Sequence, residues 1–284
     1  MFWGRYLLFL LVCIMPLYGY AYNKYHRKHY QTSKCKKFKQ KKKKDRLSYR
    51  FVNGVGNLLE EAVLLNRNLL SIDTVKVFTA FTPLYIATRM ADHPLHEKFY
   101  DEHHHKNKNQ MPETFVKVIN KGGDVGIIGL TSLTFFASDE RLRLTARIFG
   151  IGAASALLAK DIVKKMRVKA CIRPFNEKFS NKKHAYGGFP SGHMIEASYM
   201  FTLWGLQYGL KAAIPLGLFA GLSFGVLVSS NRHYISQVIA GAGFGVAYGL
   251  AANTLINTKI AETITFDFCY DERKLPTISL AYHF

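Results

Sequence analysis

The sequence predicts an all-α fold: a bundle of about six helices, mostly transmembrane, followed by a small C-terminal β-hairpin. Apolar residues recur at three- and four-residue spacings after residue 50, which is the period of a helix. Residues 212–230 and 235–257 contain no Asp, Glu, Lys or Arg, and each segment is long enough to cross a bilayer. The composition, 49% hydrophobic with four cysteines in 284 residues, excludes a collagen-like, disulfide-scaffold or wholly disordered chain.

Residues 1–21 have the features of a secretory signal peptide. Arg5 gives a positive start, residues 6–17 form an apolar run, and Gly19 and Ala21 provide the small residues of a cleavage site. We expect cleavage after Ala21. An uncleaved anchor helix is the alternative, although the apolar run is barely long enough to span a bilayer.

Most of the formal charge of +20 lies in one segment. Thirteen Lys and Arg fall between Lys24 and Arg50, with Asp45 as the one acid among them. We therefore expect no nucleic-acid partner. Residues 22–50 have no apolar period, which predicts a disordered basic tether. This tether either contacts anionic lipid head groups or stays in solvent.

The helical domain is expected over residues 51–260. Its apolar segments are, in chain order, 51–70, 75–90, 125–138, 148–163, 194–210, 212–230 and 235–257. Gly241, Gly245 and Gly249 are four residues apart, a spacing that lets two membrane helices approach closely. In the tail, 261–284, two segments alternate polar and apolar residues and predict the hairpin.

The polar stretch 93–108 separates the second apolar segment from the third. It contains several histidines together with Glu97, Asp101 and Glu102, residue types that bind transition metals. No helical or hairpin spacing places four of these side chains around one ion, so a solvated loop is the favoured interpretation.

Candidate functional residues fall in three motifs. They are Arg173-Pro174 after a lysine-rich helix end, Pro190-Ser191-Gly192-His193 before one long helix, and Asn231-Arg232-His233-Tyr234 before the last helix. Between the second and third motifs the chain passes out through one helix and back through the next. His193 and His233 are therefore expected at the same membrane surface.

The residue types around the two histidines suit a phosphate group. Lys165, Arg173 and Arg232 supply positive charge, and arginine adds a planar fork of donors that matches phosphate oxygens. Ser191 and Gly192 add donors for the same anion, together with the open amides of a helix N-terminus.

The three motifs resemble the signatures of the type 2 phosphatidic acid phosphatase (PAP2) superfamily, Lys-x6-Arg-Pro, Pro-Ser-Gly-His and Ser-Arg-x5-His-x3-Asp. The middle signature is present letter for letter, and the resemblance covers roughly residues 75–257. The other two diverge. Lys165 stands one residue before the family lysine, whose place is taken by Met166, and Leu227 and Gln237 replace the family arginine and aspartate.

The resemblance implies a PAP2-like fold and a metal-independent phosphatase without a cofactor, acting on a lipid phosphate or diphosphate. His233 attacks phosphorus to give a phosphohistidine, and His193 protonates the leaving oxygen. The expected substrate-binding residues are Lys165, Arg173, Ser191, Gly192 and Arg232. Gln237 is expected to orient His233 by accepting a hydrogen bond from its imidazole. The signal peptide and the family analogy favour an active site on the extracytoplasmic, periplasmic face of a membrane.

Two other functions stay open from the sequence. A PAP2-like membrane protein with an impaired site would bind phospholipid head groups without turnover, as Leu227 and Gln237 would suggest. The second alternative is a soluble secreted acid phosphatase of the same superfamily.

Overall fold

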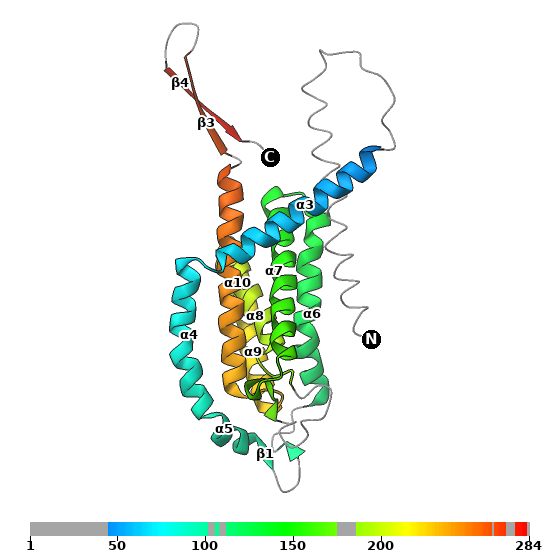
Figure 1. Ribbon diagram of the computed structural model, residues 1–284, viewed down its shortest axis with the longest axis vertical. Helices are drawn as coiled ribbons and strands as arrows, with labels where there is room; N and C mark the ends of the chain where they lie inside the picture. The colour runs from blue at the N-terminus through cyan, green and yellow to red at the C-terminus, as the bar shows by residue number, and fades with distance from the viewer. Residues whose placement is uncertain are drawn as a thin grey trace.

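The computed structural model describes residues 45–101, 106–107, 112–174, 186–262, 264–270 and 276–282. The signal peptide expected at 1–21 and the tether from 22 to 44 lie outside these residues. The described part of the chain contains eight α-helices, which form an elongated bundle (Figure 1). The predicted all-α fold is confirmed.

Five helices build the body of the bundle. They are α6 (Glu113–Phe136), α7 (Glu140–Lys165), α8 (Gly192–Tyr208), α9 (Leu210–Ser229) and α10 (Ile235–Glu262). The core lies between α7, α8 and α10, where Phe149 stacks on Tyr199 with ring centroids 4.9 Å apart. Both side chains are fully buried.

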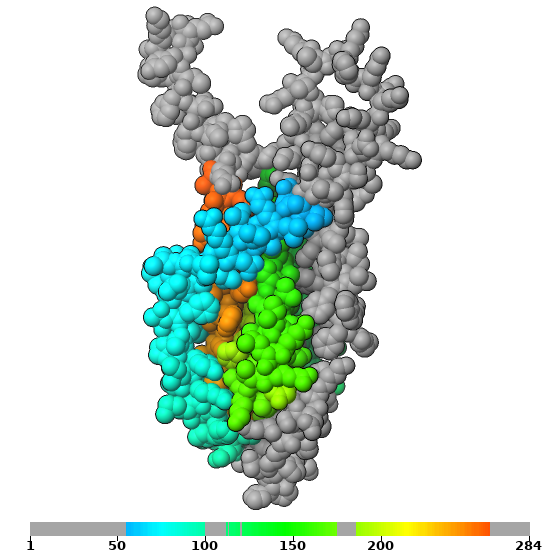
Figure 2. All heavy atoms as spheres, viewed as in Figure 1, coloured from blue at the N-terminus to red at the C-terminus, as the bar shows by residue number. Residues whose placement is uncertain are grey.

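Three further helices wrap this body. α3 (Asp45–Asn68) crosses one end of the bundle obliquely, and α4 (Ile72–Met90) runs along its side, as the space-filling view also shows (Figure 2). α5 (Asp92–Phe99) lies at the opposite end from α3 (Figure 1). The backbone of α3 begins at Asp45, inside the segment expected to be the tether.

Polar residues extend the structure beyond the apolar segments. α5 forms in the polar stretch expected to be a loop, with Asp92 in its first turn, where a negative charge favours the helix N-terminus. It is followed by the short antiparallel pair β1 (Tyr100–Asp101) and β2 (Lys106–Asn107). α7 begins well before residue 148 because Asp139 caps it, accepting a hydrogen bond from the Leu142 amide at 2.6 Å.

Three of the described helices, α7, α9 and α10, are long and apolar enough to cross a membrane. A fourth span results if α3 and α4, which are bent by 54° at their junction, form one broken span. Only 28% of the apolar stretch of α9 is buried, against 67% for α10. α9 thus presents its apolar surface outwards, and α10 is the central helix. These helices support a membrane location.

Glycine allows α10 to pack closely on α8. A Cβ atom at Gly241 would meet the Ser191 carbonyl oxygen at 2.6 Å, and one at Gly245 would overlap the Ser198 hydroxyl. A Cβ at Gly249 would collide with α8 in the same way. The close approach predicted from the glycine spacing is confirmed, and it holds the start of α8 against the start of α10.

The chain ends in two strands. β3 (Ile264–Tyr270) and β4 (Pro276–Tyr282) pair antiparallel, with Ile264 opposite Tyr282, close to the ranges expected for the hairpin. They follow the end of α10 that lies beside α3 (Figure 1).

Candidate active site

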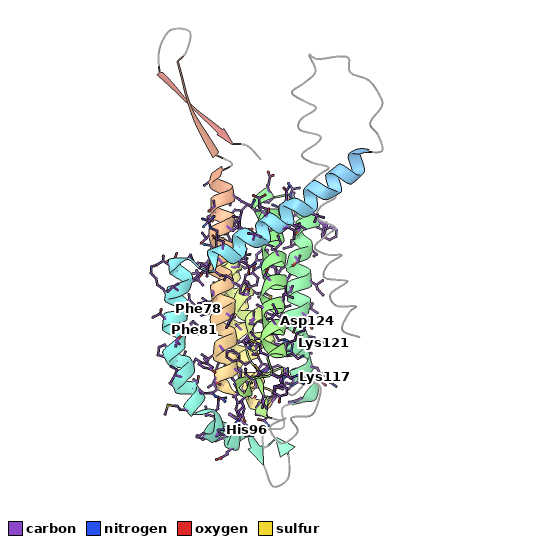
Figure 3. The ribbon with its side chains drawn as sticks, viewed as in Figure 1. Phe78, Phe81, His96, Lys117, Lys121 and Asp124 are labelled. Atoms are coloured by element: carbon purple, nitrogen blue, oxygen red, sulfur yellow. The ribbon has the colours of Figure 1, made fainter. Side chains whose placement is uncertain are left out.

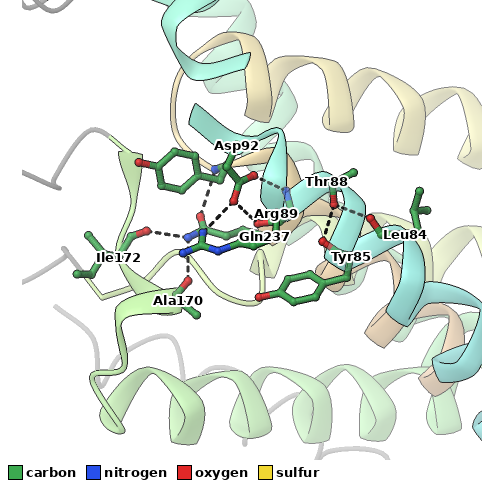
Figure 4. A network of polar contacts seen from close by, with 10 residues as sticks. Leu84, Tyr85, Thr88, Arg89, Asp92, Ala170, Ile172 and Gln237 are labelled. Carbon is green, nitrogen blue, oxygen red and sulfur yellow. Dashed lines mark hydrogen bonds and ion pairs between the residues drawn. The ribbon is translucent and has the colours of Figure 1, made fainter. Parts of the chain in front are cut away.

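Gln237, at the end of the bundle where α5 lies, links the segments that carry the three motifs, and Figure 4 shows its contacts with Ala170 and Ile172. Its side-chain amide donates hydrogen bonds to the carbonyl oxygens of Ala170 at 3.0 Å and Ile172 at 2.7 Å, in the loop before Arg173. The Ser191 amide donates to the Gln237 carbonyl oxygen at 3.1 Å. One residue of α10 thereby positions both earlier motifs.

His233 is buried, with 4% of its surface exposed. Its Nδ1 lies 2.9 Å from the carbonyl oxygen of Gly188. Because a carbonyl oxygen only accepts hydrogen bonds, Nδ1 carries the proton, and Nε2 of the neutral ring is left with a free lone pair. His233 follows Asn231, whose φ of 56° makes the sharp turn between α9 and α10.

The surroundings of His233 keep its ring neutral. Burial lowers the pKa of His233 well below its ordinary value of 6.5, because the charged imidazolium loses its hydration. The positive charges of Arg173 and Lys160, together with His193, lower this pKa further. A neutral imidazole is the form that can attack phosphorus.

His193 differs from His233 in exposure and in partner. It stands in the first turn of α8 with 34% of its side chain exposed. Its Nδ1 lies 3.4 Å from the Glu196 carboxylate, which is 5% exposed. One histidine therefore faces a neutral carbonyl and the other a carboxylate.

Buried donors without a partner surround the two histidines. Within the described residues, Arg173 Nε, Ser191 Oγ and Asn231 Nδ2 are buried and form no hydrogen bond. Arg173 also donates through Nη2 to the Gly187 carbonyl oxygen at 3.2 Å. Burial and the charge of Arg232 lower the pKa of the Arg173 guanidinium, which nonetheless stays protonated in proteins. Unpaired buried donors beside two arginines are suited to bind an anion.

A family model described as the PAP2 superfamily matches residues 144–261, which contain all three motifs and run from α7 to α10. This match supports membership of the PAP2 superfamily. No curated protein and no solved structure matches the chain. Membership supports a phosphatase-type function.

The lysine nearest the PAP2 motifs is not the expected one. Lys165 is exposed at the C-terminal end of α7. Lys160, one and a half turns earlier, is half-buried, and its ammonium lies so close to Gly192 that a Cβ there would overlap it. The two lysines are five residues apart and point about 140° away from each other around the helix. Lys160 therefore faces the start of α8, where Lys165 was expected.

The structure also corrects the expected part of Gln237. Among the described residues, its amide group contacts backbone groups, including the Tyr234 amide at 3.3 Å, and not the His233 ring. The Gly188 carbonyl occupies Nδ1 of His233 instead. At the second divergent position of the PAP2 motif, Leu227 is fully buried in an apolar cluster with Met194.

α5 covers the PAP2 site from the side of the last motif. A small cavity lies next to His233 between α5 and the turn before α10, and its lining is mainly apolar, with Leu95 and Phe99 on α5 and Val228 on α9. His96, visible on α5 in Figure 3, contacts Asn231 Oδ1 through Nδ1.

Asp92 fixes the position of α5 and α10. Its carboxylate accepts hydrogen bonds from the Ser236 amide at 3.0 Å and the Ser236 hydroxyl at 2.6 Å, and it pairs with Arg89 at 2.8 Å (Figure 4). It therefore caps α10 from a different helix. The described residues contain no group of three His, Cys, Asp or Glu suited to a metal ion, and residues 103–105 of the histidine-rich stretch lie outside them.

The sequence did not predict roles for Lys160, Glu196 and Asp92. Two of them carry a signal in the sequence. Glu196 follows His193 by three residues, which places both on one face of a helix, and Lys160 is a charge inside an apolar run. Asp92 carries no such signal, because its partner Ser236 is 144 residues away.

Proposed function

We propose that the protein is a metal-independent phosphatase that hydrolyses a lipid phosphate or diphosphate through a phosphohistidine on His233. The observation that carries the proposal is the state of His233: a buried, neutral ring whose Nδ1–H is held by the Gly188 carbonyl. Its Nε2 is free for nucleophilic attack beside buried, unpartnered donors.

The reaction takes place in two displacements. In the first, Nε2 of His233 forms a bond to phosphorus, the bond from phosphorus to the lipid oxygen breaks, and His193 gives its proton to that oxygen. In the second, water attacks phosphorus and loses a proton to His193, and the P–N bond breaks. Inorganic phosphate leaves, and both histidines return to their starting states.

The charged and hydrogen-bond-donating groups beside His233, which we call the cradle, stabilise the charge that develops on the phosphoryl oxygens. Arg173, Arg232 and Lys160 supply the positive charge, and the Ser191 hydroxyl and the Gly192 amide add donors at the N-terminus of α8. The side chain of Ser191 makes no capping bond to α8 and is available to a ligand. Lys165 remains a candidate for a contact farther out, with a polar head group.

Lipid substrates are supported by what surrounds the cradle. α7, α9 and α10 are apolar enough to cross a membrane, and apolar side chains make up part of the lining of the small cavity beside His233. A phosphate attached to an acyl or isoprenoid chain would meet both a polar cradle and apolar surroundings. We place the cradle on the extracytoplasmic face of the membrane, in keeping with the signal peptide.

A specific observation favours a second candidate, a phospholipid head-group binder without turnover. His233 faces a neutral carbonyl in place of the family's aspartate, so less negative charge stabilises the imidazolium formed in the transition state. Such a protein would bind phosphate in the same cradle and release none from an ester.

The test uses the purified full-length protein in detergent micelles, with a chelator present. We expect it to release phosphate from a lipid phosphate and vanadate to inhibit the reaction. His233→Ala should abolish turnover, whereas His93→Ala, which changes an exposed histidine on α5, should not. A folded wild type that binds phosphate but hydrolyses none of a panel of lipid phosphates would establish the head-group binder. Activity that requires a divalent ion would contradict the histidine mechanism.

A further inference from the structure

The buried carboxylate of Glu196 points at one of the two histidines. Glu196 stands one turn after His193 on the same face of α8, with Oε2 3.4 Å from Nδ1. This is a long hydrogen bond, and long hydrogen bonds between catalytic groups often tighten only when substrate is bound. Nε2 of His193 is left for the substrate.

This carboxylate is buried at a point where α6 has a glycine and so leaves room for it. Glu196 is 4% exposed, and α6 approaches it at Gly123, where a Cβ would overlap Oε2. A buried carboxylate is costly unless it is paired with positive charge. Lys160 on α7 interacts with it electrostatically, so Glu196 lies between an ammonium and an imidazole.

We propose that Glu196 is a positioning residue that orients His193 for general-acid catalysis. The inference rests on the proposed phosphatase function and deepens it. A carboxylate stabilises an imidazolium more strongly than a neutral carbonyl does. The unequal partners of His193 and His233 thereby assign the acid to one and the nucleophile to the other. The carboxylate missing at Gln237 is replaced by one that acts on the other histidine.

The charged groups of this site come from four elements. Glu196 belongs to α8, Lys160 to α7, Arg173 to the loop after α7, and His233 to the turn before α10. Asp124 on α6 (Figure 3) interacts with Lys160. Among these groups, Glu196 is the negatively charged side chain that contacts the His193 ring directly.

Two variants test this role with an alkyl lipid phosphate and with p-nitrophenyl phosphate. Glu196→Gln removes the charge and keeps the shape. We expect turnover of the alkyl ester to fall about 30-fold. Turnover of the nitrophenyl ester should fall only about threefold, because its leaving group needs little protonation. The alkaline limb of the pH profile should move to lower pH, because the carboxylate that favours a charged imidazole is gone.

Gly123→Ala is the second variant, and it keeps the charge. Its methyl group displaces the flexible end of Glu196 and leaves the backbone in place, so the same dependence on leaving group and pH is expected even if Glu196→Gln folds poorly. In a His193→Ala background neither substitution should have a further effect, because the residue through which Glu196 acts is gone.

The outcomes separate the two proposals. An active wild type whose pH profile and leaving-group dependence are unchanged in both variants overturns the role of Glu196 alone. The same holds if the loss of activity persists in the His193→Ala background, since that result indicates a structural role. A wild type that hydrolyses neither ester overturns the proposed function, and this inference with it.

Discussion

The two ends of the bundle differ in whether their buried charges have partners within the chain. At the end beside α3, Glu61 lies between Arg147 at 2.8 Å and Lys259 at 3.3 Å, and its side chain is 4% exposed. At the other end, Arg173 and Arg232 lie near each other, and Arg173 Nε has no hydrogen-bond partner among the described residues. Buried charge near α3 is compensated within the chain, whereas charge left unmatched at the other end is available to a ligand.

Several neutral polar groups show a similar contrast, although Trp204 Nε1, near Gln207 on α8, is also buried without a hydrogen-bond partner among the described residues. Near α3, Gln207 accepts hydrogen bonds from Arg141 at 3.1 and 3.2 Å and donates to Asn253 at 2.7 Å. These contacts join α7, α8 and α10 within an apolar bundle, as polar side chains commonly do between membrane helices. At the site end, Ser191 Oγ and Asn231 Nδ2 are buried without a partner in the described structure. One end is thus built for packing and the other for binding.

The largest expected effect is on stability, at the α3 end. Glu61→Gln removes the carboxylate that Arg147 and Lys259 share, which should cost about 3 kcal/mol because buried positive charge is left uncompensated. Denaturant unfolding in detergent measures the change. Glu60→Gln, at the exposed neighbouring position, should change stability by less than about 0.5 kcal/mol. Equal effects of the two substitutions, or a loss of activity in the folded Glu61→Gln protein, would show that the ends are not divided as described.

The next effect is on catalysis, at the site end. Lys160→Met should lower kcat/KM about 100-fold, because it removes positive charge from the phosphoryl oxygens. Lys165→Met, on the exposed face of α7, should change kcat/KM less than about threefold. Steady-state assays on one lipid phosphate measure both. A larger loss in the Lys165 variant would restore the assignment that the sequence motif favours.

A smaller effect is expected at the residue that links the motifs. From the sequence, Gln237→Asp would restore the family carboxylate and raise the rate. The structure predicts the opposite, a loss of about tenfold, because Asp provides no donors for the carbonyl oxygens of Ala170 and Ile172. Gln237→Asn is the matched control, since it is equally short but uncharged. An Asp variant faster than both the Asn variant and the wild type would mean that a carboxylate at 237 reaches His233.

The smallest effect is a dependence of stability on pH. The folded protein holds the pKa of His233 well below its ordinary 6.5, so between these two values the unfolded chain binds more protons and stability falls as pH falls. The decline caused by this one group should be no steeper than about 1.4 kcal/mol per pH unit. His233→Gln, which cannot titrate, should make the decline with falling pH shallower in the same unfolding assay. A decline of equal size in the variant would assign the acid sensitivity to other groups.

The sequence by itself determined the helical fold, the order of the motifs and the residues His193 and His233. Apolar periodicity and a short motif are local properties, readable without knowing which helices pack together. The tertiary structure decided the partners: the carboxylate of Glu196 for His193, the carbonyl of Gly188 for His233, and Lys160 in place of Lys165 beside α8. These choices depend on how far each helix is rotated and how closely it approaches its neighbours, and neither quantity is fixed by residues close together in the chain.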